Sequence, residues 1–116
     1  MTRKRNASHE FDWDRKNAPA HEAKAGHIPY EVACHAFDDE HALILDLGIV
    51  KGEHCYKCLG KVTGFDAVRC GRCFNEELIA CVVFAFRYYD GNEVVWLISP
   101  RLARKRDERK LYYAQV

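Results

Sequence analysis

Four of the six cysteines stand in two pairs with the spacing that zinc sites use. Cys55 and Cys58 form one CxxC pair, Cys70 and Cys73 form another, and 11 residues separate the two pairs. A two-residue spacing lets a tight turn direct two thiolates at one ion, and four thiolates complete a tetrahedral structural zinc site with no open position for catalysis. The spacing therefore predicts one structural zinc ion, bound by residues within 55–73.

The same cysteines allow two other interpretations. Cys55 and Cys58 could lie within a strand over residues 53–62, where alternation would send their side chains to opposite faces and prevent them from sharing an ion. Either pair could also be a redox dithiol, although no thioredoxin-like βαβ context is present. Cys34 and Cys81 lie among apolar residues, so we expect them to be small buried hydrophobes.

Basic and aromatic residues near the C-terminus could bind RNA. Residues 101–116 carry six Lys and Arg against two acidic residues, whereas residues 6–54 carry four against ten. Arginine binds phosphate through two parallel hydrogen bonds, and tyrosine rings can stack on bases. A solvated helix face would carry the same charges. The candidate RNA-binding residues are Arg87, Arg101, Arg104, Lys105 and Arg109.

The elements that must position these residues follow an α+β order. We expect a short strand at 11–14, a helix over 15–24 with Pro19 in its first turn, and a second short helix opened by Pro29. Further strands are expected at 42–46, 53–62, 78–89 and 93–99, with a hairpin turn at 90–92 and a helix over 101–113. The pattern predicts a small antiparallel sheet with two N-terminal helices and one C-terminal helix.

Length and hydropathy place this order in a single domain. The chain has 116 residues, and residues 1–9 are expected to form a basic flexible tail. The longest apolar run, residues 79–86, is far shorter than the ~20 residues of a membrane-spanning helix. No apolar stretch follows the basic N-terminus as in a signal peptide, so we expect a cytoplasmic protein with reduced thiols and no membrane partner. Nucleotide-binding, GxSxG and HExxH motifs are absent from the sequence.

The order of several short motifs resembles the BrnT-type toxins. In the N-terminal half the motifs are FDWD at 11–14, KN at 16–17, IPYEVA at 28–33 and FDD at 37–39. In the C-terminal half they are GE at 52–53, Tyr56, LG at 59–60, FR at 86–87, ISPRLA at 98–103, ER at 108–109 and Tyr112. Two departures stand out: Ala25 replaces the histidine of the family's Lys-His-Gly, and residues 61–77 look inserted into a hairpin that the family keeps short.

The resemblance implies a RelE/ParE-like fold, here with a zinc-stabilised hairpin insertion. It also implies a ribonuclease that arrests growth, and neutralisation by a DNA-binding BrnA-like antitoxin. RNA cleavage through the 2′-hydroxyl needs a base, cations for the phosphorane charge and an acid for the leaving oxygen. Arg87 and Arg101 are the expected phosphate clamps. The other candidates are Glu53 or His54 as the base, Lys57 or Lys61 as assisting cations, and Tyr112 as a stacking or proton-donating group.

Two further functions fit the same residues. The chain could be a non-catalytic, zinc-stabilised module that binds nucleic acid or protein through its basic C-terminal segment, and its binding would then weaken steeply with salt. It could also be a thiol redox protein, which would form a reversible disulfide in one CxxC pair and bind no metal.

Overall fold

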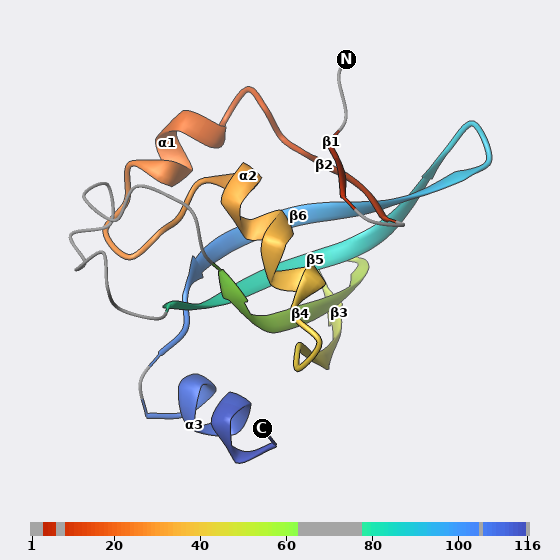
Figure 1. Ribbon diagram of the computed structural model, residues 1–116. Helices are drawn as coiled ribbons and strands as arrows, with labels where there is room; N and C mark the ends of the chain where they lie inside the picture. The colour runs from red at the N-terminus through yellow and green to blue at the C-terminus, as the bar shows by residue number, and fades with distance from the viewer. Residues whose placement is uncertain (1–3, 7–8, 63–77, 105, 116) are drawn as a thin grey trace.

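The computed structural model describes residues 4–6, 9–62, 78–104 and 106–115, which form an α+β fold on one six-stranded sheet (Figure 1). The strands are β1 (Lys4–Asn6), β2 (His9–Trp13), β3 (Leu43–Val50), β4 (Glu53–Val62), β5 (Leu78–Tyr89) and β6 (Asn92–Leu102). The helices are α1 (Ala18–Glu22), α2 (Tyr30–Ala33), the 3₁₀ helix η1 (Cys34–Asp38) and α3 (Glu108–Ala114). None of the described helices is long and apolar enough to cross a membrane.

The sheet is mixed, with strand order β1-β2-β6-β5-β4-β3. Strands β3 to β6 form an antiparallel meander, but β2 pairs with β6 in parallel, with Phe11 opposite Val95 and Trp13 opposite Leu97. The prediction of a purely antiparallel sheet is therefore wrong at this pair. Parallel strands need a long crossover connection, and here both N-terminal helices and three strands intervene between β2 and β6.

Several local predictions are confirmed because short-range signals determine them. Pro19 lies in the first turn of α1, and Pro29 immediately precedes α2. The Asp14 carboxylate closes the turn before α1 by accepting hydrogen bonds from the Lys16 and Asn17 amides at 3.2 and 3.3 Å. Strands β4 and β5 begin and end at the predicted residues.

The C-terminal boundaries differ from the prediction. Strand β6 continues through Pro100 to Leu102, and α3 begins only at Glu108 instead of at residue 101. A proline is tolerated here because β2 ends opposite Leu97, so no strand needs the missing amide on that side. The Pro100 carbonyl instead accepts from the Ile28 amide at 3.4 Å. Residues 4–6, expected in a flexible tail, pair with β2 as strand β1.

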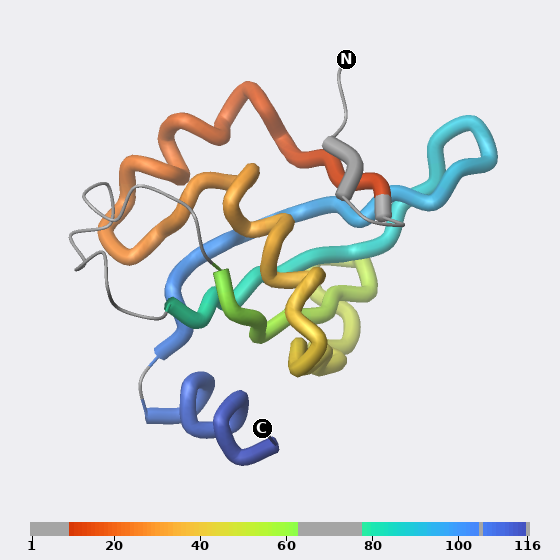
Figure 2. The backbone as a smooth tube through the Cα atoms, viewed as in Figure 1, coloured from red at the N-terminus to blue at the C-terminus, as the bar shows by residue number. Residues whose placement is uncertain are grey.

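The two faces of the sheet carry separate apolar clusters. Helices α2 and η1 cross one face of the sheet (Figure 2). On that face Phe37 packs between Phe11 and Phe84 at ring distances of 5.1 and 5.0 Å. Helix α3 covers part of the other face through a smaller cluster that contains Leu59, Ile79, Cys81 and Tyr112. Helix α3 covers only one end of this second face, so the remaining part of the face is open and contains a pocket.

Candidate active site

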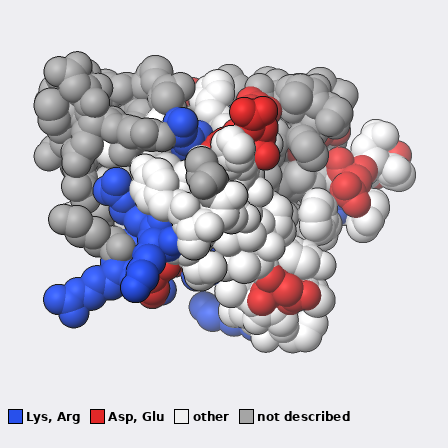
Figure 3. Space-filling view, turned by 60° about the horizontal axis from the view of Figure 1, so that its bottom comes forward, with Lys and Arg blue, Asp and Glu red and all other residues white. Residues whose placement is uncertain are grey.

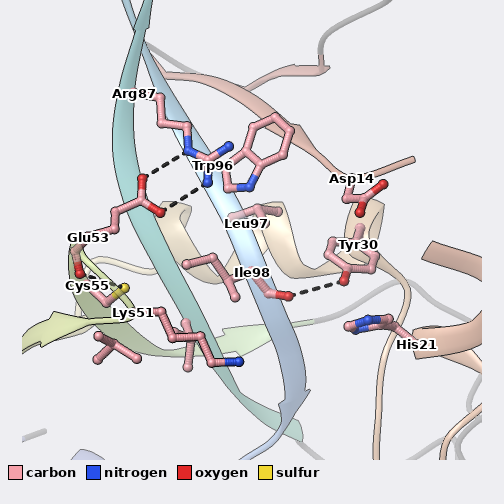
Figure 4. A pocket seen from close by; sticks show the side chains of 12 residues that line it. Asp14, His21, Tyr30, Lys51, Glu53, Cys55, Arg87, Trp96, Leu97 and Ile98 are labelled. Atoms are coloured by element: carbon pink, nitrogen blue, oxygen red, sulfur yellow. Dashed lines mark hydrogen bonds and ion pairs between the residues drawn. The ribbon is translucent and has the colours of Figure 1, made fainter. Parts of the chain in front are cut away.

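A pocket of about 360 Å³ lies on the sheet face that α3 leaves open (Figure 4). Residues of the β3–β4 turn, of β4, β5 and β6, and of the segment around α1 and α2 form its wall. The lining residues are Asp14, His21, Tyr30, Val50, Lys51, Glu53, Cys55, Val83, Arg87, Trp96, Leu97 and Ile98. The pocket therefore joins segments that are far apart in the sequence.

Two predicted catalytic residues, Glu53 and Arg87, meet in this pocket. The guanidinium of Arg87 donates from Nε and Nη2 to the two carboxylate oxygens of Glu53, at 2.9 and 3.0 Å. It also lies 4.3 Å from the ring centre of Trp96. These hydrogen bonds hold the pKa of Glu53 below its usual value, so its side chain is a carboxylate at neutral pH. A carboxylate and a guanidinium, both charged, are thus held side by side in an open pocket.

The opposite side of the pocket carries aromatic and polar groups. The Tyr30 hydroxyl donates to the Ile98 carbonyl at 3.2 Å, and burial raises the pKa of this phenol. His21 lies beside Tyr30 with its Nδ1 atom buried and without a hydrogen-bond partner within the described chain. Hydrogen bonds from the Asn17 side chain and amide lower the pKa of Asp14, which keeps it ionised. These groups add hydrogen-bonding capacity on the side away from the ion pair.

A second set of predicted site residues surrounds the Glu108 carboxylate, under α3. The Arg101 guanidinium donates hydrogen bonds to both carboxylate oxygens of Glu108, each at 2.7 Å. The Lys57 ammonium donates to the same carboxylate at 3.0 Å, and the Arg104 backbone amide donates to it at 2.8 Å. The Cys81 thiol also donates to it, at 3.4 Å. Burial alone would raise the pKa of Glu108, which is 1% exposed, but the hydrogen bonds from Arg101, Arg104 and Lys57 outweigh burial and hold that pKa far below its usual value. We name these five residues the Glu108 cluster.

The two predicted phosphate clamps are therefore not brought together. Arg87 lies in β5 opposite Val94, whereas Arg101 lies in β6 opposite Cys81. Cys81 precedes Arg87 by six residues in β5. That separation is roughly 20 Å by the rise of a strand. Arg101 and Lys57 are both part of the Glu108 cluster, and neither lines the pocket.

Three further predicted residues also lie away from the Glu53–Arg87 pair. Tyr112 is buried, and its hydroxyl donates to the Asp39 carboxylate, which also accepts from the Lys61 amide at 2.8 Å. The His54 ring stacks on Tyr56 on the opposite face of β4 from Glu53, and its Nε2 lies 2.7 Å from the Asp46 carboxylate. None of Tyr112, Lys61 and His54 lines the pocket.

The predicted RNA-binding residues do not share one helical face. Arg104 precedes α3 and pairs with Asp107 at 3.0 Å, whereas Arg109, within α3, lies 5.8 Å from the ring centre of Tyr113. Lys105 lies outside the described residues. Basic side chains still gather on one part of the surface seen from the α3 side (Figure 3).

Cys55 and Cys58 are the described half of the CxxC…CxxC pattern. They cannot bind one metal ion together while β4 keeps its strand conformation, because their side chains lie on opposite faces of the sheet. Cys55 lines the pocket, whereas Cys58 packs on the opposite face, with its thiol 3.8 Å from the Ala36 carbonyl. Burial raises the pKa of Cys58 to about 12 and also raises that of Cys55 above its usual value, so both groups are protonated thiols at neutral pH while no metal is bound. No group of three or more potential metal ligands occurs among the described residues. Cys70 and Cys73 lie outside those residues, so the four-cysteine site stays a prediction.

Cys34 and Cys81 are fully buried, which confirms their predicted burial, but the surroundings of Cys81 are not wholly apolar because its thiol donates to the Glu108 carboxylate.

Sequence reasoning missed most of the pocket wall. No motif links the missed residues, which come from five places in the chain: the turn before α1, α1, α2, the β3–β4 turn and β6 hold Asp14, His21, Tyr30, Lys51 and Trp96 respectively. One local signal was present, because Lys51 and Gly52 lie between the strands expected at 42–46 and 53–62. Whether the Lys51 side chain lines the pocket depends on where that turn lies relative to the sheet, and this is set by the tertiary structure.

Comparison with models of protein families finds no family that matches this chain, and comparison with curated proteins finds no significant match. The resemblance to BrnT-type toxins therefore rests on the motifs alone.

Proposed function

We propose that this chain is a small ribonuclease of the BrnT toxin type, with its active site in the pocket around Glu53 and Arg87. The observation that carries the proposal is the paired arrangement of these two side chains in an open pocket beside Trp96. The β3–β6 meander, preceded by two short helices, is compatible with the RelE/ParE-like fold that the resemblance implies.

In the proposed step, Glu53 takes the proton of an RNA 2′-hydroxyl. The 2′-oxygen then bonds to the adjacent phosphorus while the bond from phosphorus to the 5′-oxygen breaks. The leaving 5′-oxygen takes a proton from water, and the proton held by Glu53 converts the resulting hydroxide back to water, which regenerates the base. Arg87 stabilises the extra negative charge on the phosphate oxygens. Glu53 occupies two of the five N–H donors of a guanidinium, so others are left for phosphate. The products would be a 2′,3′-cyclic phosphate and a 5′-hydroxyl.

The test is RNA cleavage by purified protein, with the ends of the products identified. We expect the wild type to produce cyclic phosphate ends in the presence of a chelator, because the proposed step uses no metal. Glu53→Gln keeps the shape of the side chain but removes the base, so the rate should fall by ~10²–10⁴-fold. Arg87→Lys keeps the charge but loses the planar fork and should lower the rate by about 10²-fold.

The chain offers a matched control for Arg87. Arg15 also lies over a tryptophan, 4.1 Å from the Trp13 ring centre, and bonds a carboxylate, Asp12, at 3.0 Å. Arg15 does not line the pocket, so Arg15→Lys should leave the rate unchanged. Intact RNA after incubation with the wild type would refute the ribonuclease proposal and favour the non-catalytic binding module. Equal rates for wild type and Glu53→Gln would place the chemistry elsewhere.

The partner that accompanies this proposal is a BrnA-like antitoxin. We expect its gene to lie next to that of the toxin and its co-expression to restore growth in cells that express this chain. Growth arrest that persists with the neighbouring protein present would count against this partner.

A further inference from the structure

The turn between β3 and β4 holds a lysine in a backbone conformation that lysine rarely adopts. Val50 pairs with Glu53, so Lys51 and Gly52 are the two turn residues, with φ angles of +51° and +82°. Two consecutive positive φ angles make this a type I′ hairpin turn, in which asparagine, aspartate or glycine is the favoured first residue. A side chain without that preference is strained there.

The β5–β6 hairpin shows the favoured residue at the same position of its turn. Asp90 and Gly91 connect β5 to β6 with φ angles of +51° and +80°, and Asp90 does not line the pocket. The two turns therefore have the same geometry, but only the turn at the pocket carries lysine. Local strain of this kind is most often retained where the side chain has a function.

The position of the Lys51 side chain indicates what that function is. Figure 4 shows the side chain reaching into the pocket, toward the side lined by His21 and Tyr30. Among the described residues, the Lys51 ammonium forms no hydrogen bond or ion pair, whereas Arg87 is neutralised by Glu53. Lys51 is thus a cation in the pocket without an ion-pair partner among the described residues, since Glu53 pairs with Arg87 and Asp14 is bonded by Asn17.

We propose that Lys51 is a second phosphate-binding residue of this pocket, beside Arg87, held in place by the strained β3–β4 turn. The inference rests on the proposed function, because it assigns the residue that holds an RNA phosphate beside Glu53 and Arg87. The ammonium binds a non-bridging phosphate oxygen as a point charge, a role that needs reach and charge but no fixed fork.

The test measures binding separately from cleavage. The ligand is a hexanucleotide built of 2′-deoxy units, which lacks the hydroxyl that the proposed cleavage requires. Lys51→Asn places the favoured residue in the turn and removes the charge, Lys51→Arg restores the charge, and Asp90→Asn is the matched change in the other turn. Binding is measured by titration over a series of salt concentrations, and thermal unfolding is measured for each variant.

We expect Lys51→Asn to bind about tenfold more weakly at low salt and to lower the slope of log K against log salt by about 0.7, the value for one phosphate contact on a single strand. The same variant should unfold ~2–5 °C higher, because the turn strain is relieved. Lys51→Arg and Asp90→Asn should bind within about twofold of the wild type. Weaker binding by a more stable protein separates a binding role from a structural role.

Three results would overturn the inference: no binding by the wild type, equal binding by Lys51→Asn, or a loss in Lys51→Arg as large as in Lys51→Asn. The cleavage assay separates the two proposals. A wild type that binds the hexanucleotide through Lys51 but cuts no RNA retains the phosphate site and refutes the ribonuclease. A wild type that cuts RNA as fast as Lys51→Asn refutes the phosphate site only.

Discussion

At the scale of single residues, two carboxylates with lowered pKa values have different surroundings. Glu53 and Arg87 are each about one third exposed, at 31% and 35%, so their pair is screened by water and open to a ligand. Glu108 is almost fully buried and is bonded by Arg101, Lys57 and the Arg104 amide. The first pair is suited to chemistry, and the second joins α3 to the sheet.

Stability should fall in acid because of Glu108. Its pKa in the folded protein lies below the ordinary value of 4.5, so below pH 4.5 the unfolded chain takes up a proton that the folded chain does not. The stabilisation is fully present above that pH and is lost as pH falls toward the folded pKa, at up to about 1.4 kcal/mol per pH unit for one group.

Urea unfolding at several pH values checks this prediction. Glu108→Gln should be less stable than the wild type by about 3 kcal/mol at pH 7, because Arg101 and Lys57 lose their buried counter-charge. It should also show a weaker decline in stability between pH 5 and pH 3. A decline as steep as that of the wild type would assign the acid sensitivity to other carboxyl groups, such as Asp39.

The hydroxyl of Tyr112 should matter for stability and not for cleavage. It donates to the Asp39 carboxylate between α3 and the segment after η1, so Tyr112→Phe should lower the free energy of unfolding by about 1–2 kcal/mol. Tyr113 is the matched control, because its ring is 41% exposed and Tyr113→Phe should change little. A folded Tyr112→Phe protein that has lost RNA cleavage would instead support the catalytic role predicted from the sequence.

At the scale of elements, the contact between β4 and η1 decides how closely the helical layer approaches the sheet. Gly60 lies in β4 directly beneath η1, and a Cβ atom there would overlap the Ala36 carbonyl group. The neighbour is backbone and cannot rotate away, so a side chain at position 60 would push η1 off the sheet.

Gly60→Ala should therefore destabilise the protein by about 3 kcal/mol, although alanine is compatible with the strand conformation. Unfolding in urea measures the change, and Lys61→Ala, at the adjacent exposed position, should cost much less. A stability loss in Gly60→Ala below ~0.5 kcal/mol would mean that η1 does not lie this close to β4.

Element boundaries followed from local signals only in part. Strands β4 and β5 and the Asp90–Gly91 turn were predicted correctly because alternation and turn residues encode them locally. The start of α3 was predicted too early in the chain. Residues 101–113 have helical composition, but Arg101 and Leu102 are held in β6 by pairing with Cys81 and Ala80. Tertiary pairing outweighed helix propensity there.

At the scale of the whole molecule, the sheet separates two environments, and the cysteines report on them. Cys55 faces the pocket, and Cys58 faces the core beneath η1. Cys55 is only 3% exposed and Cys58 is fully buried, so we expect an alkylating reagent to modify Cys55 slowly in the folded protein and Cys58 only after unfolding.

Metal analysis and a chelator complete this test. A four-cysteine zinc site would instead protect both thiols equally, release them together on chelation and lower the unfolding temperature, because metal binding would contribute to folding. About one zinc per chain with equal protection would show that β4 opens at residues 55–58 to bind the ion.

The sequence by itself determined the α+β class, most strand positions, the turn residues and the burial of Cys34 and Cys81, since alternation, turn chemistry and hydrophobicity act over a few residues. Glu53 and Arg87 were among the candidate site residues, and the structure brings these two together, whereas their catalytic role stays a prediction. Only the tertiary structure decided that β2 pairs in parallel with β6, that Glu108 engages Arg101, and that Lys51 reaches the pocket. These relations join residues far apart in the chain, so they depend on strand register and on which face of the sheet each side chain occupies.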